Sequence, residues 1–187
     1  MSDSKFANPA TLGLMAFGMT TVLLNLHNLG LFPLGSMILS MGLFFGGIAQ
    51  VIAGIMEYRN SNMFGMTAFT AYGLFWLSLV SLIVIPELGL AQPAGKTAMA
   101  AYLLMWGVFT ALMTVSASRL NKALLTVFVT LTILFALLAV GQFNPLILRI
   151  AGYEGILCGF TAIYTGFADI TNDVYGRTVI PIWPIKR

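Results

Sequence analysis

Charge is the property that this chain has least of. Only 8% of its 187 residues are Asp, Glu, Lys or Arg, whereas 59% are hydrophobic. A water-soluble domain carries about 25% charged and about 45–50% apolar residues, so a water-soluble fold is nearly excluded. Disorder is excluded too, because disordered chains are polar and rich in charge. A mean hydropathy of +0.93 instead predicts a protein of the lipid bilayer, and the formal charge of +3 does not indicate a nucleic-acid partner.

The residues of common catalytic and metal sites are equally scarce. Cys158 is the single cysteine and His27 the single histidine, so neither an intrachain disulfide nor a Cys/His metal site is expected. The sequence contains no GxxxxGK[ST], HExxH or GxSxG motif, which argues against ATP-driven pumping and against the usual hydrolases. We therefore predict that the chain is not an enzyme and holds no metal or cofactor.

Long apolar runs fill the chain and predict an all-α membrane protein with six transmembrane helices. Each run is long enough to cross ~30 Å of hydrocarbon as a helix, and continuous apolar runs do not suit the alternating strands of a β-barrel. Residues 1–187 then form a single six-helix transmembrane domain. The start lacks the basic region of a secretory signal, so the first span is expected to remain in the mature protein. The spans are about residues 9–30, 34–56, 64–85, 97–116, 123–141 and 146–170.

The basic residues predict the orientation of the spans. With both termini in the cytoplasm, the cytoplasmic segments hold Lys5, Arg59, Arg119, Lys122, Arg177, Lys186 and Arg187. The opposite loops hold Lys96 and Arg149. This excess satisfies the positive-inside rule for a multi-pass protein.

Polar side chains inside the first span are candidates for a substrate path. Phe17, Thr21, Asn25 and Asn28 follow one another at spacings of four, four and three residues, which places them on one helical face. His27 lies beside this stripe. Polar groups in a span are costly unless paired or wetted, so they are functional candidates by default. The alternative is that they join neighbouring helices by hydrogen bonds.

A stripe of small residues marks the second span. Gly42, Gly46, Gln50 and Gly54 recur every fourth residue, which allows two helices to approach closely. Gln50 is a bulky amide in this stripe and needs a partner or water. Glu57 follows near the cytoplasmic edge, where it is either a solvated charge at a helix end or a residue of a cytoplasmic mouth.

The remaining spans add hydroxyl groups but no obvious charge at the middle of the membrane. Thr130 and Leu131 lie in the fifth span, and Asp169 and Asp173 near the end of the sixth are expected at the interface. Amides and hydroxyls near both ends, with aromatic and leucine side chains between, suit a narrow path for a small polar solute. The pattern does not suit an alkali-cation site, which requires carboxylates or carbonyl rings at depth.

Several ordered motifs resemble those of one transporter family, the acetate uptake transporters or succinate–acetate permeases. The head of the first span, Asn8-Pro9-Ala10-Thr11-Leu12-Gly13-Leu14, resembles the family signature NPAPLGL, with Thr11 where the family usually has Pro. The resemblance covers essentially the whole chain. It continues through residues 18–21, 25–28, 46–50, 53–54, 57–58, 64–70, 106–110 and 176–178.

The resemblance implies proton-linked uptake of acetate and succinate-like carboxylates. It implies six helices per subunit, a hexameric ring in the cell inner membrane, and one path through each subunit. It also implies a narrow apolar constriction, which corresponds to Phe17, Tyr72 and Leu131 here. Asn8, Pro9 and Gly13 of the signature, with Glu57, are expected at the cytoplasmic mouth. If the signature shapes that mouth, Thr11 could alter substrate preference.

An ionised carboxylate must lose its water at such a constriction, which costs free energy. Aliphatic carboxyl groups titrate at about pH 4–5, so acetate is almost fully ionised at pH 7, and a bare anion in a dry constriction is costly. Either amide and hydroxyl donors solvate the anion, or it crosses as acetic acid after taking up a proton. The expected donors are Asn25, Asn28, Gln50 and Thr130, and His27 either passes the proton or is a neutral hydrogen-bond partner.

Two other functions remain open from the residues. The first alternative is a urea or short-amide channel, whose flux would not depend on solute protonation. The second is a sensor or assembly protein without transport, although no cytoplasmic segment is long enough for an output domain. An intramembrane enzyme is least favoured, because no nucleophile–base pair is evident.

Overall fold

Six long helical stretches form the protein, as a computed structural model shows. The structure describes residues 7–185, which contain no β-strand, and a single bridge pairs Asn121 with Pro184. The six stretches are long and apolar enough to cross a membrane, which confirms the predicted number of spans. The elements are α1 (Ala10–Asn28), α2 (Ser36–Ser40), η1 (Met41–Ala49), α3 (Gln50–Arg59), α4 (Met63–Glu87), α5 (Lys96–Ala117), α6 (Lys122–Gly141) and α7 (Pro145–Tyr175).

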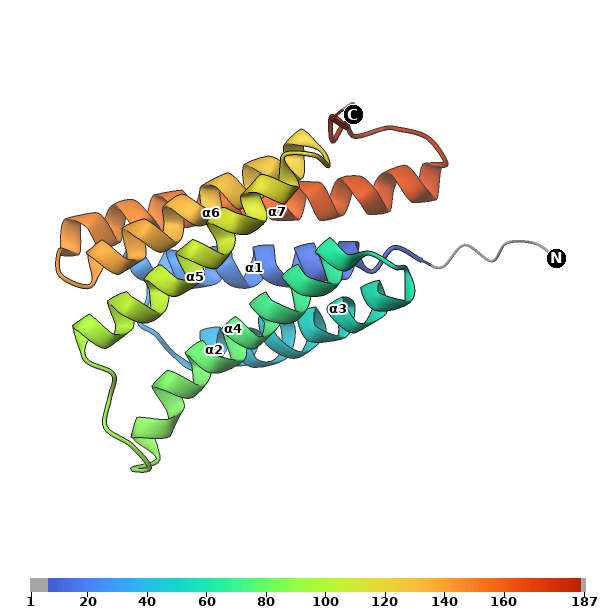
Figure 1. The fold of residues 1–187 in the computed structure, drawn as a ribbon. Coiled ribbons are helices and arrows are strands. Elements are labelled where there is room, and N and C mark those ends of the chain that lie inside the picture. The colour runs from blue at the N-terminus through green and yellow to red at the C-terminus, as the bar shows by residue number, and fades with distance from the viewer. Residues whose placement is uncertain (1–6, 186–187) are drawn as a thin grey trace.

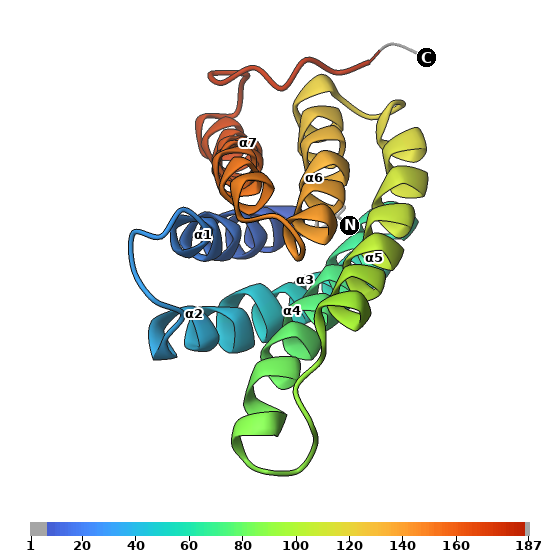
Figure 2. The same ribbon diagram turned by 90° about the vertical axis from the view of Figure 1, so that its left-hand side faces the viewer.

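The helices form a bundle with two distinct ends. α1 packs against α7 and against η1 and α3, α4 packs on α3 and η1, and α6 lies between α5 and α7. Both described chain ends lie at one end of the bundle, which we call the terminal end (Figure 1). The end with the loops at 29–35, 88–95 and 142–144 is the opposite end. Figure 2 shows α1, α6 and α7 as one group of helices and α2, α3 and α4 as another.

The second span differs from the single α-helix that a uniform apolar run predicts. Its middle part, η1, is a nine-residue π-helix, whose i→i+5 hydrogen bonds widen the backbone. The glycines pack within the chain. A Cβ on Gly46 would lie 2.9 Å from the Trp76 ring and 3.0 Å from Thr20, and Gly54 packs against Thr70. The small-residue stripe is therefore a seam between this span and α1 and α4.

Two helices begin at an Asn-Pro pair. Asn8 Oδ1 accepts the Ala10 N–H at 3.0 Å, and Asn144 Oδ1 accepts the Leu146 N–H at 3.0 Å. Each amide thus satisfies a backbone donor that the first helical turn leaves free. α7 extends to Tyr175, beyond the predicted end at residue 170, and closes on Gly176 at φ 63°, a conformation that favours glycine.

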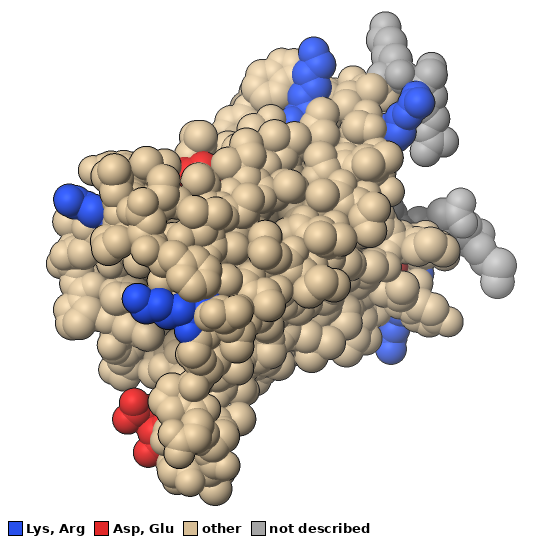
Figure 3. Space-filling model, turned by 60° about the vertical axis from the view of Figure 1, so that its left-hand side comes forward, with Lys and Arg blue, Asp and Glu red and all other residues tan. Residues whose placement is uncertain are grey.

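Charged side chains lie toward the ends of the molecule. The broad surface between them is almost entirely uncharged (Figure 3), as a lipid-facing surface requires. Arg59, Arg119, Lys122 and Arg177 belong to the terminal end, and Lys96 and Arg149 to the opposite end. Lys5, Lys186 and Arg187, which complete the predicted basic set, lie outside the described residues.

Candidate functional site

A cavity of about 220 Å³ enters the bundle from the terminal end. On the same measure one water needs only ~10–15 Å³, so a small carboxylate with several waters fits. Its mouth is polar and its depth is apolar. The lining residues that the argument uses are Asn8, Asn62, Asn121, Asp169 and Thr165 toward the mouth, and Leu14, Phe17, Gln50, Tyr72, Phe128 and Leu131 toward the interior. We call this space the terminal cavity.

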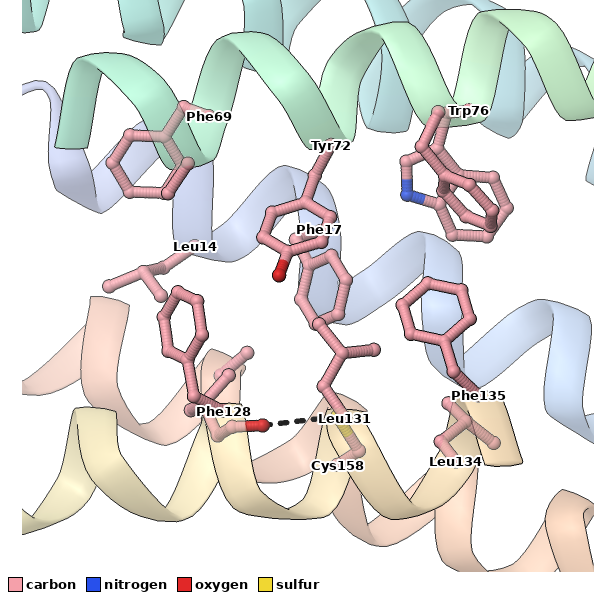
Figure 4. Close-up of a cluster of buried hydrophobic side chains, with 14 of the residues drawn as sticks. Leu14, Phe17, Phe69, Tyr72, Trp76, Phe128, Leu131, Leu134, Phe135 and Cys158 are labelled. Carbon is pink, nitrogen blue, oxygen red and sulfur yellow. Dashed lines mark hydrogen bonds between the residues drawn. The ribbon is translucent and has the colours of Figure 1, made fainter. Parts of the chain in front are cut away.

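Phe17, Tyr72 and Leu131 meet in the terminal cavity, and we call them the central cluster. They come from α1, α4 and α6, and each is at most 5% exposed. The Phe17 and Tyr72 rings lie 5.9 Å apart between centroids. Figure 4 shows the Leu131 side chain directed toward the Phe17 ring and the Tyr72 hydroxyl end near them. The structure therefore joins three residues that are far apart in sequence.

The position of the Tyr72 ring is held from several sides. Its hydroxyl donates to Thr110 Oγ1 on α5 at 2.9 Å. Phe109 contacts the ring edge-on with centroids 5.5 Å apart, and Phe128 lies 6.1 Å away. Because the hydroxyl is already bonded, the ring presents mainly its apolar faces to the cavity. Thr110 is a partner that sequence reasoning did not identify.

A larger polar hollow of about 1220 Å³ adjoins the mouth of the terminal cavity, and we call it the vestibule. Asn8, Asn62 and Asp169 line both spaces. Arg59 and Arg177 lie among its walls together with Glu57, Asp169 and Asp173, so the hollow carries charges of both signs. Thr11, the residue that departs from the family signature, also lines the vestibule and donates to the Asn8 carbonyl at 3.0 Å.

Glu57 lies in the wall of the vestibule but is not a solvated end charge. Its side chain is 1% exposed, and Oε2 accepts from Asn62 Nδ2 at 3.0 Å. Within residues 7–185, Oε1 has no hydrogen-bond partner. The Glu57 side chain is therefore not exposed to bulk water, and its role at a cytoplasmic mouth stays a prediction. Gly13, also of the signature, packs against the Phe69 ring.

Three buried polar atoms around the central cluster have no hydrogen-bond partner within the part of the chain that the structure describes. They are Thr21 Oγ1, Gln50 Oε1 and Trp76 Nε1. Gln50 lines the terminal cavity. Thr21 and Trp76 lie one helical turn beyond Phe17 and Tyr72, toward the opposite end. Figure 4 shows the indole nitrogen of Trp76 on the side that faces Tyr72. Unpaired buried polar groups are costly, which makes these atoms candidates for solute contacts.

The other predicted path residues of α1 bond locally. Asn25 Nδ2 donates to the Thr21 carbonyl at 2.9 Å, and Asn28 Nδ2 donates to Asn25 Oδ1 at 3.0 Å. Asn25 also packs against Gly155 of α7. His27 Nδ1 lies 2.9 Å from the Phe32 carbonyl oxygen, in the loop after the helix. None of these three side chains lines the terminal cavity, so their place in a path stays a prediction.

Thr130 is likewise bonded to its own helix. Its Oγ1 donates to the Thr126 and Val127 carbonyls at 2.8 and 3.0 Å. Such bonds commonly satisfy a hydroxyl within a helix. Thr130 is buried beside the central cluster but does not line the terminal cavity, and its role as a donor stays a prediction.

Sequence reasoning missed a carboxylate within the sixth span. Glu154 is the tenth residue of α7, which places it about 14 Å along the axis from the helix start. Both of its oxygens are buried and lack a hydrogen-bond partner among residues 7–185. The expectation that no charged residue lies deep in the membrane is therefore corrected. A hydropathy average over the apolar run conceals one Glu, whereas a search for single acidic residues within spans finds it.

The described part of the site is a cavity that leads from polar amides to an apolar cluster. Residues 7–185 hold no group of three His, Cys, Asp or Glu side chains that could bind a metal ion. Beside the apolar cluster lie three unpaired polar atoms, Gln50 Oε1 on the cavity side and Thr21 Oγ1 and Trp76 Nε1 beyond it.

Comparisons with known proteins agree over the whole chain. The sequence model of the GPR1/FUN34/yaaH family matches residues 1–187 of this chain. A relative from Escherichia coli K12, named succinate-acetate/proton symporter SatP, is 50% identical over 97% of this chain and 98% of its own length. Acetate permease A of Emericella nidulans is 32% identical over 95% of this chain and 66% of its own. A solved structure of the bacterial acetate channel SatP is 51% identical, covers 95% of this chain and 99% of its own, and has a TM-score of 0.94.

Proposed function

This chain belongs to the GPR1/FUN34/yaaH family, and from that we propose that it carries acetate and related short carboxylates such as succinate across the inner membrane, linked to protons. It is a multi-pass membrane protein. The observation that carries the proposal is the terminal cavity, which leads from a polar vestibule to the buried central cluster. The relatives compared above are named as transporters and channels, which supports a transport function without catalysis.

The central cluster is the constriction of this path. Phe17, Tyr72 and Leu131 present apolar surface, so an ion that passes them loses most of its water. Gln50 stands on the cavity side and Trp76 beyond it, each with an unpaired polar atom. The Trp76 indole N–H is a donor that partly replaces the lost water, whereas the unpaired Gln50 Oε1 is an acceptor and can bond only the protonated form of the acid. Uptake of a proton by the carboxylate is the second way to lower the cost.

The terminal end faces the cytoplasm. The described basic residues support this, with Arg59, Arg119, Lys122 and Arg177 at that end against Lys96 and Arg149 at the other. Residues 1–187 act as one transmembrane domain, because the six helices form a continuous bundle around the cavity. The subunits assemble as a hexameric ring with one path each. Mass photometry of the detergent-solubilised protein tests this number.

The first experiment is uptake of labelled acetate into proteoliposomes at several external pH values. Protein-free liposomes must run alongside, because acetic acid crosses lipid unaided. Uptake above that background is expected to rise as the external pH falls, since both the proton supply and the protonated fraction of the substrate increase. Labelled urea runs in parallel. Urea flux without protein-dependent acetate flux would overturn the proposal and favour a urea channel, and absence of both fluxes would favour a sensor.

A further inference from the structure

Glu154 is a half-buried residue whose carboxylate the path described above does not use. It belongs to α7, which packs against α1 and α6. Both oxygens are buried, and neither has a partner within residues 7–185. An ionised carboxylate in such a place pays a large desolvation cost without a compensating bond. The group therefore needs a ligand, and the smallest one is a proton.

The charged surroundings of Glu154 provide no counter-ion. Within its own helix, Arg149 lies five residues toward the opposite end and Cys158 lies one turn toward the terminal end. The titratable residue of α6 is Lys122, at the terminal end of that helix. The titratable residue of α1 is His27, which lies near the opposite end and bonds Phe32. The packing of Gly155 on Asn25 and of Gly152 on Leu29 places His27 near the level of Glu154, but within residues 7–185 no side chain of either neighbouring helix forms a hydrogen bond with the Glu154 oxygens.

The position of Glu154 relates it to the central cluster. Cys158, one turn away on the same face, is fully buried, and its Sγ lies 3.8 Å from the Val127 carbonyl oxygen of α6. Figure 4 shows Cys158 beside Leu131. Since α7 runs from the opposite end to the terminal end, Glu154 lies one turn beyond this level toward the opposite end. A proton held there is close to the point where a carboxylate must shed its water.

A polar stripe on α7 connects Glu154 with the terminal cavity. Cys158, Thr161, Thr165 and Asp169 follow Glu154 at i+4, i+7, i+11 and i+15, which is one helical face. Thr165 and Asp169 line the terminal cavity. The stripe thus begins at an unpaired carboxylate beyond the cluster and ends at a carboxylate in contact with the cavity.

We propose that Glu154 is a proton-binding site of this transporter, which takes up a proton from the opposite side and releases it as the substrate passes the central cluster. An O–H bond forms at one carboxylate oxygen and later breaks, and no other bond changes. This inference rests on the proposed function for its role in coupling. Proton binding itself does not depend on transport, so the two are tested separately.

Infrared spectroscopy of the protein in lipid tests proton binding. A protonated carboxyl group whose carbonyl accepts no hydrogen bond absorbs at higher wavenumber than a hydrated one. We expect such a band to grow as the pH falls in the wild-type protein and to be lost in Glu154→Gln. The matched control is Glu87→Gln, at an exposed residue that ends α4, which should leave the band in place. Absence of the band at every pH, or its survival in Glu154→Gln, overturns the proposal.

Proton and acetate fluxes measured together in proteoliposomes test the coupling. Glu154→Gln should keep labelled acetate uptake but lose most of the acetate-driven proton uptake, whereas Glu87→Gln should keep both. Unchanged proton uptake in Glu154→Gln overturns the coupling role. If Glu154→Gln carries no acetate, Glu154→Asp decides, because only a titratable role predicts that Asp restores both fluxes. If the wild-type protein shows no protein-dependent acetate flux, the proposed function fails, and the infrared band still decides proton binding.

Discussion

The two sides of the central cluster are built differently, although the sequence places amides near both ends of the bundle. On the terminal side, Asn62 and Asn121 cap helix starts by accepting the Gly65 and Leu124 N–H groups, and the space between the helices stays open as the terminal cavity. On the opposite side, Asn25 bonds to its own helix and accepts from Asn28, and it packs against Gly155 of α7. The same residue type thus lines a cavity on one side and joins helices on the other.

This difference teaches that the polarity of a residue does not by itself make it part of a path. At Asn25, a glycine of the neighbouring helix lets the two helices close on the amide. Gly155 lies directly against the Asn25 side chain, whereas the amides at the terminal end stand at helix starts, where the chain separates. The following predictions test whether the two sides differ in this way, from the largest expected effect to the smallest.

Leu131→Val shortens a side chain of the central cluster, which separates the two sides. The wider constriction should admit a longer acid such as lactate. Loss of a methylene from an apolar site changes selectivity by about 10–200-fold, so the ratio of lactate to acetate uptake is expected to rise at least about tenfold. Labelled uptake in proteoliposomes measures both acids. The control is Ile133→Val, on the exposed face of the same helix. An unchanged ratio with intact acetate flux would show that Leu131 does not form the constriction.

Gly155→Ala tests the close packing of the opposite side. The added Cβ would overlap the Asn25 side chain, so we expect a loss of about 1–3 kcal/mol in the free energy of unfolding. Thermal unfolding in detergent measures the change. Gly95→Ala is the control, because a Cβ there has open space around it. Equal stability of Gly155→Ala and the wild-type protein would mean that Asn25 moves freely, and the contrast between the two sides would fail.

Tyr72→Phe removes the hydrogen bond to Thr110 and keeps the apolar ring at the central cluster. The expected cost is about 1 kcal/mol of stability, with acetate flux largely retained, because Thr110 still donates to the Trp106 carbonyl. Tyr58→Phe, at a side chain that is 72% exposed, provides the comparison. If the variant remains folded but loses most of its acetate uptake, the Tyr72 hydroxyl contacts the substrate.

His27→Gln should have the smallest effect. The Gln amide can still bond the Phe32 carbonyl, so stability should change by no more than about 0.5 kcal/mol. The dependence of acetate uptake on external pH should also remain as in the wild-type protein. Uptake measured over the same pH series checks this, and a flattened profile would make His27 a proton carrier and weaken the case for Glu154.

The number and approximate limits of the six spans follow from the sequence alone. A bilayer requires about twenty apolar residues per helix, and the chain is punctuated by Pro, Gly and charged residues at that spacing. The starts at Asn8 and Asn144 are also local, because a capping amide and the proline that follows act within one turn. The three residues of the central cluster were identified through the family motifs, since nothing in their spacing relates α1, α4 and α6.

Only the tertiary structure decided which polar groups are paired and which are not. Gln50 directly follows the π-helix η1 and lines the terminal cavity, which is built from helices that are distant in the chain. Glu154 is one acidic residue in an apolar run, and only the folded chain buries both of its carboxylate oxygens without a hydrogen-bond partner among residues 7–185. Hydropathy is a sum over neighbours in sequence, whereas hydrogen-bond partners and desolvation depend on neighbours in space.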